Sequence, residues 1–290
     1  MLGKLIKGVT RAVRRGMKAR APLAEAPDIA QHRLLFIGGL HRSGTSIVHE
    51  LLREHPAVSG FTDTGVMEDE GQHLQSVFAP AWQVGGPGLF AFDPRAHLTE
   101  DSPLVTPANR DRLLREWGAY YDLGKPLLLE KSPPNLVRSR FFQAMFPNAS
   151  FLFIVRHPLA VALATRKWAD ASLQDLLRHW HAAYSIMLAD SRHLQRCRII
   201  RYEDLVASPQ ACWDQVCDLA GIERFTPRQA IVDHNAKYFA IWEREYPQER
   251  AAIEAAWLRE PGPLQTFGYS FGEPFVGACS DARVRDWHPA

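Results

Sequence analysis

The residues of this sequence best suited to chemistry lie in one short loop, residues 38–46, which reads GGLHRSGTS. An apolar run, residues 34–37, precedes the loop, and apolar residues at helical spacing follow it. A loop between a strand and a helix N-terminus points backbone N–H groups at an anion, and the helix dipole adds about half a positive charge. The loop is therefore predicted to bind a phosphate-like group.

This loop departs from the nucleotide P-loop pattern G-x-x-x-x-G-K-[ST] at a single position. Residues 39–46 match the pattern elsewhere, but Thr45 stands where the lysine that reaches the β- and γ-phosphates is expected. The basic residue has moved to Arg42. The loop is consequently poorly equipped for a triphosphate.

Three further apolar runs read as strands, and each is followed by polar residues that could reach a ligand. The runs are residues 126–130, 151–155 and 198–201, and the polar residues after them are Lys131 and Ser132, Arg156, and Tyr202. Ligands of parallel sheets gather at the carboxyl ends of the strands. We therefore expect Lys131 to place an ammonium beside the bound anion, unless it pairs with Glu130 or Glu68 at the rim of the sheet.

Helical patterns separate these strand candidates, at residues 110–121, 159–169, 173–193 and 209–220. Alternation of strands and helices with short links is typical of a parallel sheet covered by helices on both faces. The predicted fold class is therefore α/β, with a central parallel sheet flanked by helices. An aromatic stripe, which comprises Tyr238, Phe239, Trp242 and Tyr246, is typical of core packing and could alternatively line a pocket.

Taken together, these motifs resemble those of sulfotransferases that use 3′-phosphoadenosine 5′-phosphosulfate (PAPS). The 5′-phosphosulfate loop of that family reads basic-Ser-Gly-Thr-Ser/Thr, and its counterpart here is Arg42, Ser43, Gly44, Thr45 and Ser46. The resemblance implies a P-loop NTPase-like fold and PAPS as co-substrate, with no metal. It also implies in-line transfer of the sulfonate to an acceptor hydroxyl, with release of adenosine 3′,5′-bisphosphate.

The resemblance further implies roles for the residues that hold the two ends of the co-substrate. Lys131 would contact the transferring sulfonate together with Arg42, and Ser132 would donate to the same oxygens. Arg156 would hold the 3′-phosphate, and Tyr202 would lie near the adenosine diphosphate moiety. The serine that the family places eight residues after this arginine is Ala164 in this chain, which leaves the adjacent Thr165 as its replacement.

Acceptor activation requires a base within hydrogen-bond reach of the attacking hydroxyl. The candidates after the first helix are the carboxylates of Asp63, Glu68 and Glu70 and the imidazole of His73. The spacing of the tyrosine-modifying branch of the family falls on Asp63, but a glutamate is expected, so Glu68 or Glu70 is the predicted base. Three consecutive carboxylates at 68–70 repel, and we expect one to pair with Lys131 or Arg42 and to have a raised pKa.

Composition limits the class of protein and its setting. A chain of 290 residues, 46% hydrophobic and 23% charged, suits one globular domain, predicted here over residues 31–290. The net charge of +2 argues against a nucleic-acid partner, and the four cysteines show no metal-ligand spacing. A cytoplasmic location is expected. The acceptor stays open among carbohydrates, lipids, small metabolites and protein tyrosines.

The N-terminal segment, residues 1–30, has a different composition from the rest of the chain. Its first 20 residues include seven basic and no acidic side chains, and apolar residues recur at helical spacing. Such a segment could form an amphipathic helix on an anionic membrane surface, followed by a linker. Together with Ala164, this segment supports one rival function, a non-catalytic, membrane-associated nucleotide-binding module. The other rival is a P-loop kinase-like phosphotransferase, although the loop lysine of that class is missing.

Overall fold

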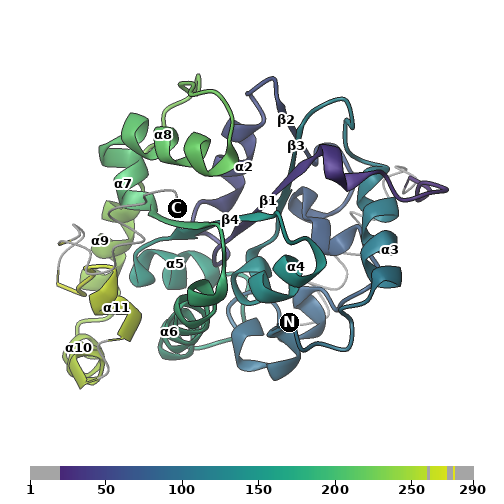
Figure 1. Cartoon of the computed structure of the whole chain (residues 1–290). Coiled ribbons are helices and arrows are strands. Elements are labelled where there is room, and N and C mark those ends of the chain that lie inside the picture. The colour runs from purple at the N-terminus through teal and green to yellow at the C-terminus, as the bar shows by residue number, and fades with distance from the viewer. Residues whose placement is uncertain (1–19, 260–261, 273–276, 278–290) are drawn as a thin grey trace.

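Five parallel strands form the centre of the protein in the computed structural model, which describes residues 20–259, 262–272 and 277 (Figure 1). The strands are β1 (Arg33–Gly38), β2 (Val58–Gly60), β3 (Leu127–Lys131), β4 (Ser150–Val155) and β5 (Cys197–Arg201). Their order across the sheet is β2-β3-β1-β4-β5, and every neighbouring pair is parallel. The predicted α/β class and all four predicted strands are confirmed. Strand β2 was not predicted, because three residues at a sheet edge are too few to show a pattern.

Helices and short 3₁₀ turns connect the strands. The helices of the described residues are α2 (Thr45–Leu52), α3 (Pro107–Gly118), α4 (Ser139–Met145), α5 (Pro158–Thr165), α6 (Leu173–Asp190), α7 (Tyr202–Ala207), α8 (Pro209–Ala220), α9 (Asn235–Glu245), α10 (Arg250–Arg259) and α11 (Gly262–Thr266). The 3₁₀ turns are η1 (Ile29–Gln31), η2 (Met67–Asp69), η3 (Gly71–His73), η4 (Ala81–Gln83), η5 (Phe90–Phe92), η6 (Pro94–Ala96), η7 (Pro133–Val137) and η8 (Ser191–His193).

Local sequence signals explain where several of these helices begin. Proline occupies the first turn of α3, α5 and α8, where its missing N–H is tolerated. The hydroxyls of Thr106 and Ser172 cap α3 and α6 by accepting hydrogen bonds from backbone N–H groups. The four predicted helices are all present, but α5 ends at Thr165, four residues earlier than predicted.

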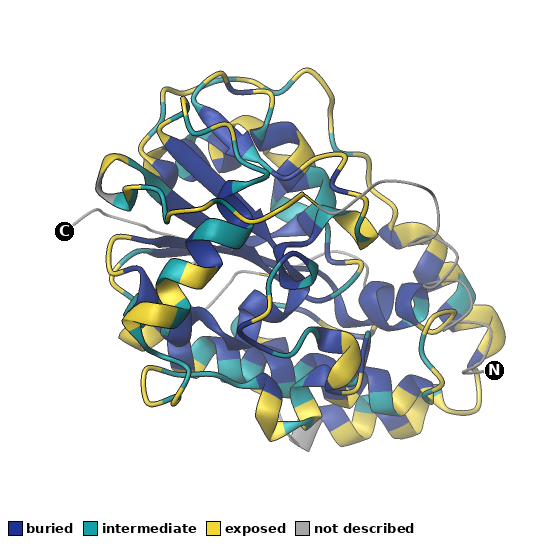
Figure 2. Ribbon diagram, turned by 90° about the vertical axis from the view of Figure 1, so that its right-hand side faces the viewer, coloured by how far each residue is buried: buried dark blue, intermediate teal, exposed yellow. Residues whose placement is uncertain are grey.

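Side chains alternate between the two faces of the sheet and divide the core into two layers. In β1, Leu34 and Phe36 pack with residues of α3 to α6, whereas Leu35 and Ile37 pack with residues of α2 and α8. Figure 1 shows α2 and α8 on one side of the sheet and α4, α5 and α6 on the other. The strand residues are buried except Arg33 and Gly60, which are half-buried, and exposed residues lie on the outer faces of the helices and in the loops (Figure 2).

The strand order places the predicted anion loop between two other strand ends. Strand β1 is central, with Ile37 opposite Lys131 of β3 and Gly38 opposite Phe153 of β4. Because all strands run parallel, the residues after β3 and β4 flank the loop after β1 at one edge of the sheet.

Most of the basic N-terminal segment lies outside the described residues. Arg20, the last of its seven basic residues, lies beside the C-terminal end of α3. The backbone N–H of Arg20 donates to the hydroxyl of Tyr120 at 3.0 Å. Leu23 continues along the same helix and bonds to the carbonyl of Arg115. In the described part of the chain, no helix combines the length and apolar character needed to cross a membrane.

Candidate active site

The loop after β1 depends on two glycines for its shape. A Cβ on Gly39 would lie 2.5 Å from the carbonyl oxygen of Ile154, so the loop passes directly against β4. Gly44 has a φ of 106° and lies against the ring of Tyr202, which a Cβ would approach to 2.9 Å. Helix α2 begins at the next residue, and no side chain caps its first turn. This helix N-terminus therefore keeps its N–H groups for an anion.

Arg42 takes an unusual conformation within the loop. Its φ is 71°, a left-handed value that a non-glycine residue seldom adopts. Its guanidinium lies over the ring of Trp168 at 4.9 Å, and its carbonyl accepts a hydrogen bond from Nη1 of Arg156 at 3.0 Å. The backbone of Arg42 thus links the anion loop to the residue that follows β4.

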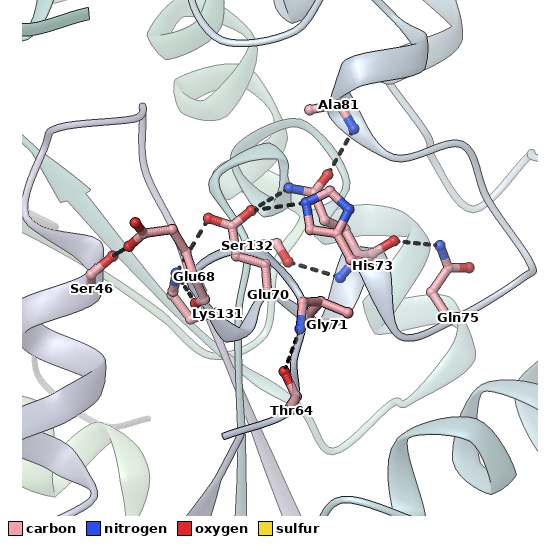
Figure 3. A network of polar contacts seen from close by, with 12 residues as sticks. Ser46, Thr64, Glu68, Glu70, Gly71, His73, Gln75, Ala81, Lys131 and Ser132 are labelled. Carbon is pink, nitrogen blue, oxygen red and sulfur yellow. Dashed lines mark hydrogen bonds and ion pairs between the residues drawn. The ribbon is translucent and has the colours of Figure 1, made fainter. Parts of the chain in front are cut away.

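Lys131 and Glu70 form a buried ion pair beside this loop (Figure 3). Nζ of Lys131 lies 3.2 Å from Oε1 of Glu70 and donates to the carbonyl of Glu68 at 2.8 Å. The exposed fractions of the two residues are 1% and 4%. Burial raises the pKa of Glu70, and the ammonium of Lys131 opposes that rise. The prediction that one of the carboxylates pairs with Lys131 or Arg42 is confirmed, and it is Glu70 that pairs with Lys131.

The three consecutive carboxylates point to three different partners, although the charge of Glu68 still helps to raise the pKa of Glu70. Glu68 is exposed and accepts from the hydroxyl of Ser46 at 3.3 Å, at the start of α2 (Figure 3). Asp69 accepts from the N–H and the hydroxyl of Thr64, which closes the loop before it. Asp63 lies exposed on that loop, and it shares positive φ values with Glu68 and Asp69. Left-handed conformations cost energy and cluster at functional sites.

The alternative base, His73, lies close to the buried pair. Its Nε2 is 3.7 Å from Oε2 of Glu70. Burial, with a smaller contribution from Lys131, lowers the pKa of His73 to about 4. The imidazole is therefore neutral near pH 7.

Ser132 lies beside Lys131, but its hydroxyl faces internal partners. It donates to Oε1 of Glu130 at 2.6 Å and accepts from the backbone N–H of Gln72 at 3.0 Å. Glu130 lies on the face of the sheet opposite to Lys131, because consecutive residues of a strand alternate. Pairing of Lys131 with Glu130, an alternative from the sequence, is therefore excluded, and the contact of Ser132 with an anion stays a prediction.

Arg156 is buried after β4, where two hydrogen bonds and two aromatic rings hold its guanidinium. Its Nε donates to Oδ1 of Asn235 at 2.8 Å, and its guanidinium lies 4.1 Å from the ring centroid of Tyr202 and 5.7 Å from that of Tyr238. Its Nη2 is buried and has no hydrogen-bond partner in the described residues. This free donor, on a fixed cation, suits a phosphate.

Thr165 and Arg156 both face the loop after β1, but no hydrogen bond joins them in the described residues. The hydroxyl of Thr165 lies 3.5 Å from the carbonyl oxygen of His41, on the loop side of α5. Ala164 instead packs against Tyr238, which is one of the rings around Arg156. Adjacent helical residues differ by about 100°, which explains why Thr165 and Ala164 face different neighbours. The role of Thr165 in place of the missing serine stays a prediction.

The sequence analysis missed two residues of this arrangement, Asn235 and Gln72. Asn235 begins α9 and also donates to Oε1 of Glu203 at 2.6 Å. Gln72 bonds through its side chain to Glu70 and through its backbone to Ser132. No local pattern marks either residue. The aromatic stripe of α9 is buried as expected, and only its Tyr238 faces Arg156.

The chain resembles known proteins over most of this region. The family model described as "Sulfotransferase family" matches residues 35–227. Among curated relatives, protein-tyrosine sulfotransferase 2 of Gallus gallus is 28% identical over 198 residues, which cover 65% of this chain and 51% of that protein. The protein-tyrosine sulfotransferase of Drosophila melanogaster is 27% identical over 199 residues, which cover 61% of this chain and 36% of that protein. The chain thus spans about half or less of the length of these relatives.

Solved structures with a related arrangement include a sulfotransferase from Alicyclobacillus acidocaldarius. It is 17% identical, with a TM-score of 0.45, and the match covers 78% of this chain and 98% of that one. This sequence identity and this TM-score are too low to carry an argument about chemistry. The chemistry is therefore inferred from the residues of this chain.

Proposed function

Because the chain belongs to the sulfotransferase family, we propose that it transfers the sulfonate of PAPS to an acceptor hydroxyl. The observation that carries this proposal is the buried pair of Lys131 and Glu70 beside the anion loop. The pair joins a fixed cation, suited to charge on a transferring group, to a carboxylate, suited to accept a proton. A non-catalytic binding module would not need the second of these groups.

The anionic groups of PAPS match the donors of the site. The uncapped N-terminus of α2 and the loop that contains Arg42 would hold the 5′-phosphosulfate, with Lys131 at the sulfonate. Arg156 would take the 3′-phosphate with its unpartnered Nη2. Tyr202 would lie at the adenosine side, because its ring packs against both Gly44 and the guanidinium of Arg156.

The proposed reaction is an in-line displacement at sulfur. The acceptor hydroxyl loses its proton to Glu70 while its oxygen forms a bond to sulfur. The bond between sulfur and the bridging phosphate oxygen breaks, and its electron pair leaves with adenosine 3′,5′-bisphosphate. Lys131 stabilises the charge that develops on the transferring group and its leaving oxygen.

Glu70 suits the role of base better than Glu68 does. Glu70 is buried, its pKa is raised by that burial, and Lys131 keeps its ionised form accessible. Glu68 is exposed, and its carboxylate faces Ser46 at the N-terminus of α2, where the anion is expected. We therefore assign the base role to Glu70 and expect Glu68 to move aside when the anion binds.

For the acceptor we propose the phenol of a tyrosine in a protein or peptide. The support is the name of the curated relatives, which are protein-tyrosine sulfotransferases. A phenol, with a pKa near 10, also loses its proton to a carboxylate more readily than an alkyl alcohol does. Sugar, lipid and small-metabolite hydroxyls are the competing acceptors in the test below.

The first test compares ligands by thermal unfolding. Adenosine 3′,5′-bisphosphate should stabilise the protein by about 2.7 kcal/mol at a hundredfold excess over its Kd, and ATP with Mg²⁺ should stabilise it much less. The second test supplies PAPS labelled with ³⁵S and a library of tyrosine peptides, with matched phenylalanine peptides as the control. Equal stabilisation by Mg-ATP would favour the kinase alternative, and label on cell-extract lipids or glycans alone would overturn the tyrosine acceptor.

A further inference from the structure

Glu130 is a buried carboxylate directly beneath the segment that presents Glu70. It is the penultimate residue of β3 and is 1% exposed. A Cβ on Gly71 would lie only 2.5 Å from Oε1 of Glu130, so the backbone of the segment rests on this carboxylate. Trp117, which packs on the same face of the sheet, also fixes the segment by donating its indole N–H to the carbonyl of Gly71 at 3.0 Å.

A continuous chain of hydrogen bonds runs from Glu130 to the buried ion pair. Ser132 donates to Glu130 and accepts from the backbone of Gln72, whose side-chain amide donates to Oε2 of Glu70. The other oxygen of Glu70 meets Lys131. The second oxygen of Glu130 accepts from Asn135, which also donates to the carbonyl of Ile37 at the end of β1.

The hydrogen bonds at Glu130 suit its ionised form, in which both oxygens act only as acceptors. Both of its oxygens accept, one from the hydroxyl of Ser132 and one from the amide of Asn135. A proton on Glu130 would put a third donor among these groups, and either Ser132 or Asn135 would lose its acceptor. Protonation of Glu130 therefore changes the hydrogen bonding of Ser132, the residue that links it to Gln72 and Glu70.

No cation pairs with Glu130 in the described part of the chain. The charged and titratable groups that interact with it electrostatically are those of Glu70, Lys131, Tyr121 and Arg138. None of the four forms a hydrogen bond or ion pair with its carboxylate. A buried carboxylate without a cation is costly, and packing alone would be served as well by an apolar residue.

We propose that Glu130 is a positioning residue whose ionised carboxylate, acting through Ser132 and Gln72, holds Glu70 against Lys131. The inference rests on the proposed function, because it concerns the base of that reaction. It goes beyond that function by making the geometry of the base depend on a group that touches neither the co-substrate nor the acceptor. Transfer is then controlled by two coupled carboxylates rather than by one.

The test measures the pH profile of sulfonate transfer to the tyrosine peptides for wild type and Glu130→Gln. The amide keeps the shape but cannot accept from Ser132 and Asn135 together. We expect kcat to fall on the order of ten- to a hundredfold, as for a small displacement of a reacting group. The acid limb of the profile should also move to lower pH, because a negative charge near Glu70 is removed. A purely structural role would lower kcat without moving that limb.

A second variant and a control make the result specific. Ser132→Ala breaks the same series of hydrogen bonds. The double variant, which combines Glu130→Gln with Ser132→Ala, should therefore transfer sulfonate no more slowly than Ser132→Ala alone. Glu116→Gln is the matched control: Glu116 also accepts from a serine hydroxyl and an N–H group, those of Ser76, but has no link to Glu70. If the losses of kcat in Glu130→Gln and Ser132→Ala multiplied in the double variant, the inference would be overturned. A wild-type pH profile in Glu130→Gln would overturn it as well.

Failure of the inference can be told apart from failure of the proposed function. If the wild type transfers no sulfonate, the proposed function fails, and infrared spectroscopy still decides the inference. In that case a carboxylic-acid C=O band should appear in the wild type as the pH falls through neutrality, together with a shift of the Glu70 carboxylate band. Glu130→Gln should lack both changes, and an unchanged Glu70 band in the wild type would refute the coupling.

Discussion

Replacement of Glu130 by glutamine should change how the stability of the protein depends on pH. Burial raises the pKa of Glu130 from 4.5 to about 7, so the folded protein holds its proton more tightly than the unfolded chain does. Between these two values the folded state binds more protons, and its stability falls as the pH rises. The shift corresponds to about 3 kcal/mol in total. About 2 to 3 kcal/mol of this should be lost between pH 5 and pH 8.

Urea unfolding followed by tryptophan fluorescence at several pH values measures this effect. Other groups also titrate: burial lowers the pKa of four histidines to about 3, and their contribution to stability is lost as the pH falls from 6.5 towards that value. These histidines are His41, His49, His157 and His179. Because they are present in both proteins, the difference between wild type and Glu130→Gln isolates Glu130.

The expected result is that the variant gains stability relative to wild type as the pH rises from about 5 to about 8. The partly exposed Glu116, replaced by glutamine, is expected to keep the wild-type slope. Parallel curves for wild type and Glu130→Gln would refute the reasoning, because they would mean that Glu130 does not change its protonation state in this range.

The other predictions concern the site and the N-terminus. Lys131→Ala should lower turnover on the order of a hundredfold with little loss of bisphosphate binding. Arg156→Ala should instead weaken bisphosphate binding first, as measured by calorimetry. The reverse pattern would contradict the roles assigned. Glu70→Gln should abolish transfer while bisphosphate binding survives, and Glu68→Gln should keep most of the activity. An active Glu70→Gln enzyme would shift the base role to Glu68, Asp63 or His73. Deletion of residues 1–25 should preserve transfer to a soluble peptide but abolish salt-sensitive sedimentation with anionic vesicles, because each basic residue near such a surface contributes about 1 kcal/mol. If the full-length protein does not sediment with these vesicles at low salt, the proposed peripheral membrane location is wrong.

The sequence alone was sufficient to predict the α/β class, four of the five strands and a candidate anion loop after the first of them. Apolar runs located β1, β3, β4 and β5, because a buried strand of a parallel sheet is apolar on both faces. The glycines and small polar residues of the loop after β1 indicated a candidate anion site, because backbone N–H groups and a helix N-terminus follow from local conformation. The edge strand β2 escaped prediction because its three residues carry no periodicity.

Only the tertiary structure decided how the polar side chains pair. Glu70 meets Lys131 across 61 residues of sequence, and Arg156 meets Asn235 across 79. The loop that presents Glu68 and Glu70 contains left-handed residues, so no helix or strand period predicts where its side chains point. The sequence therefore showed which chemical groups were available, whereas the packing of distant segments determined that Glu70 is buried with Lys131 and that Glu130 lies beneath them.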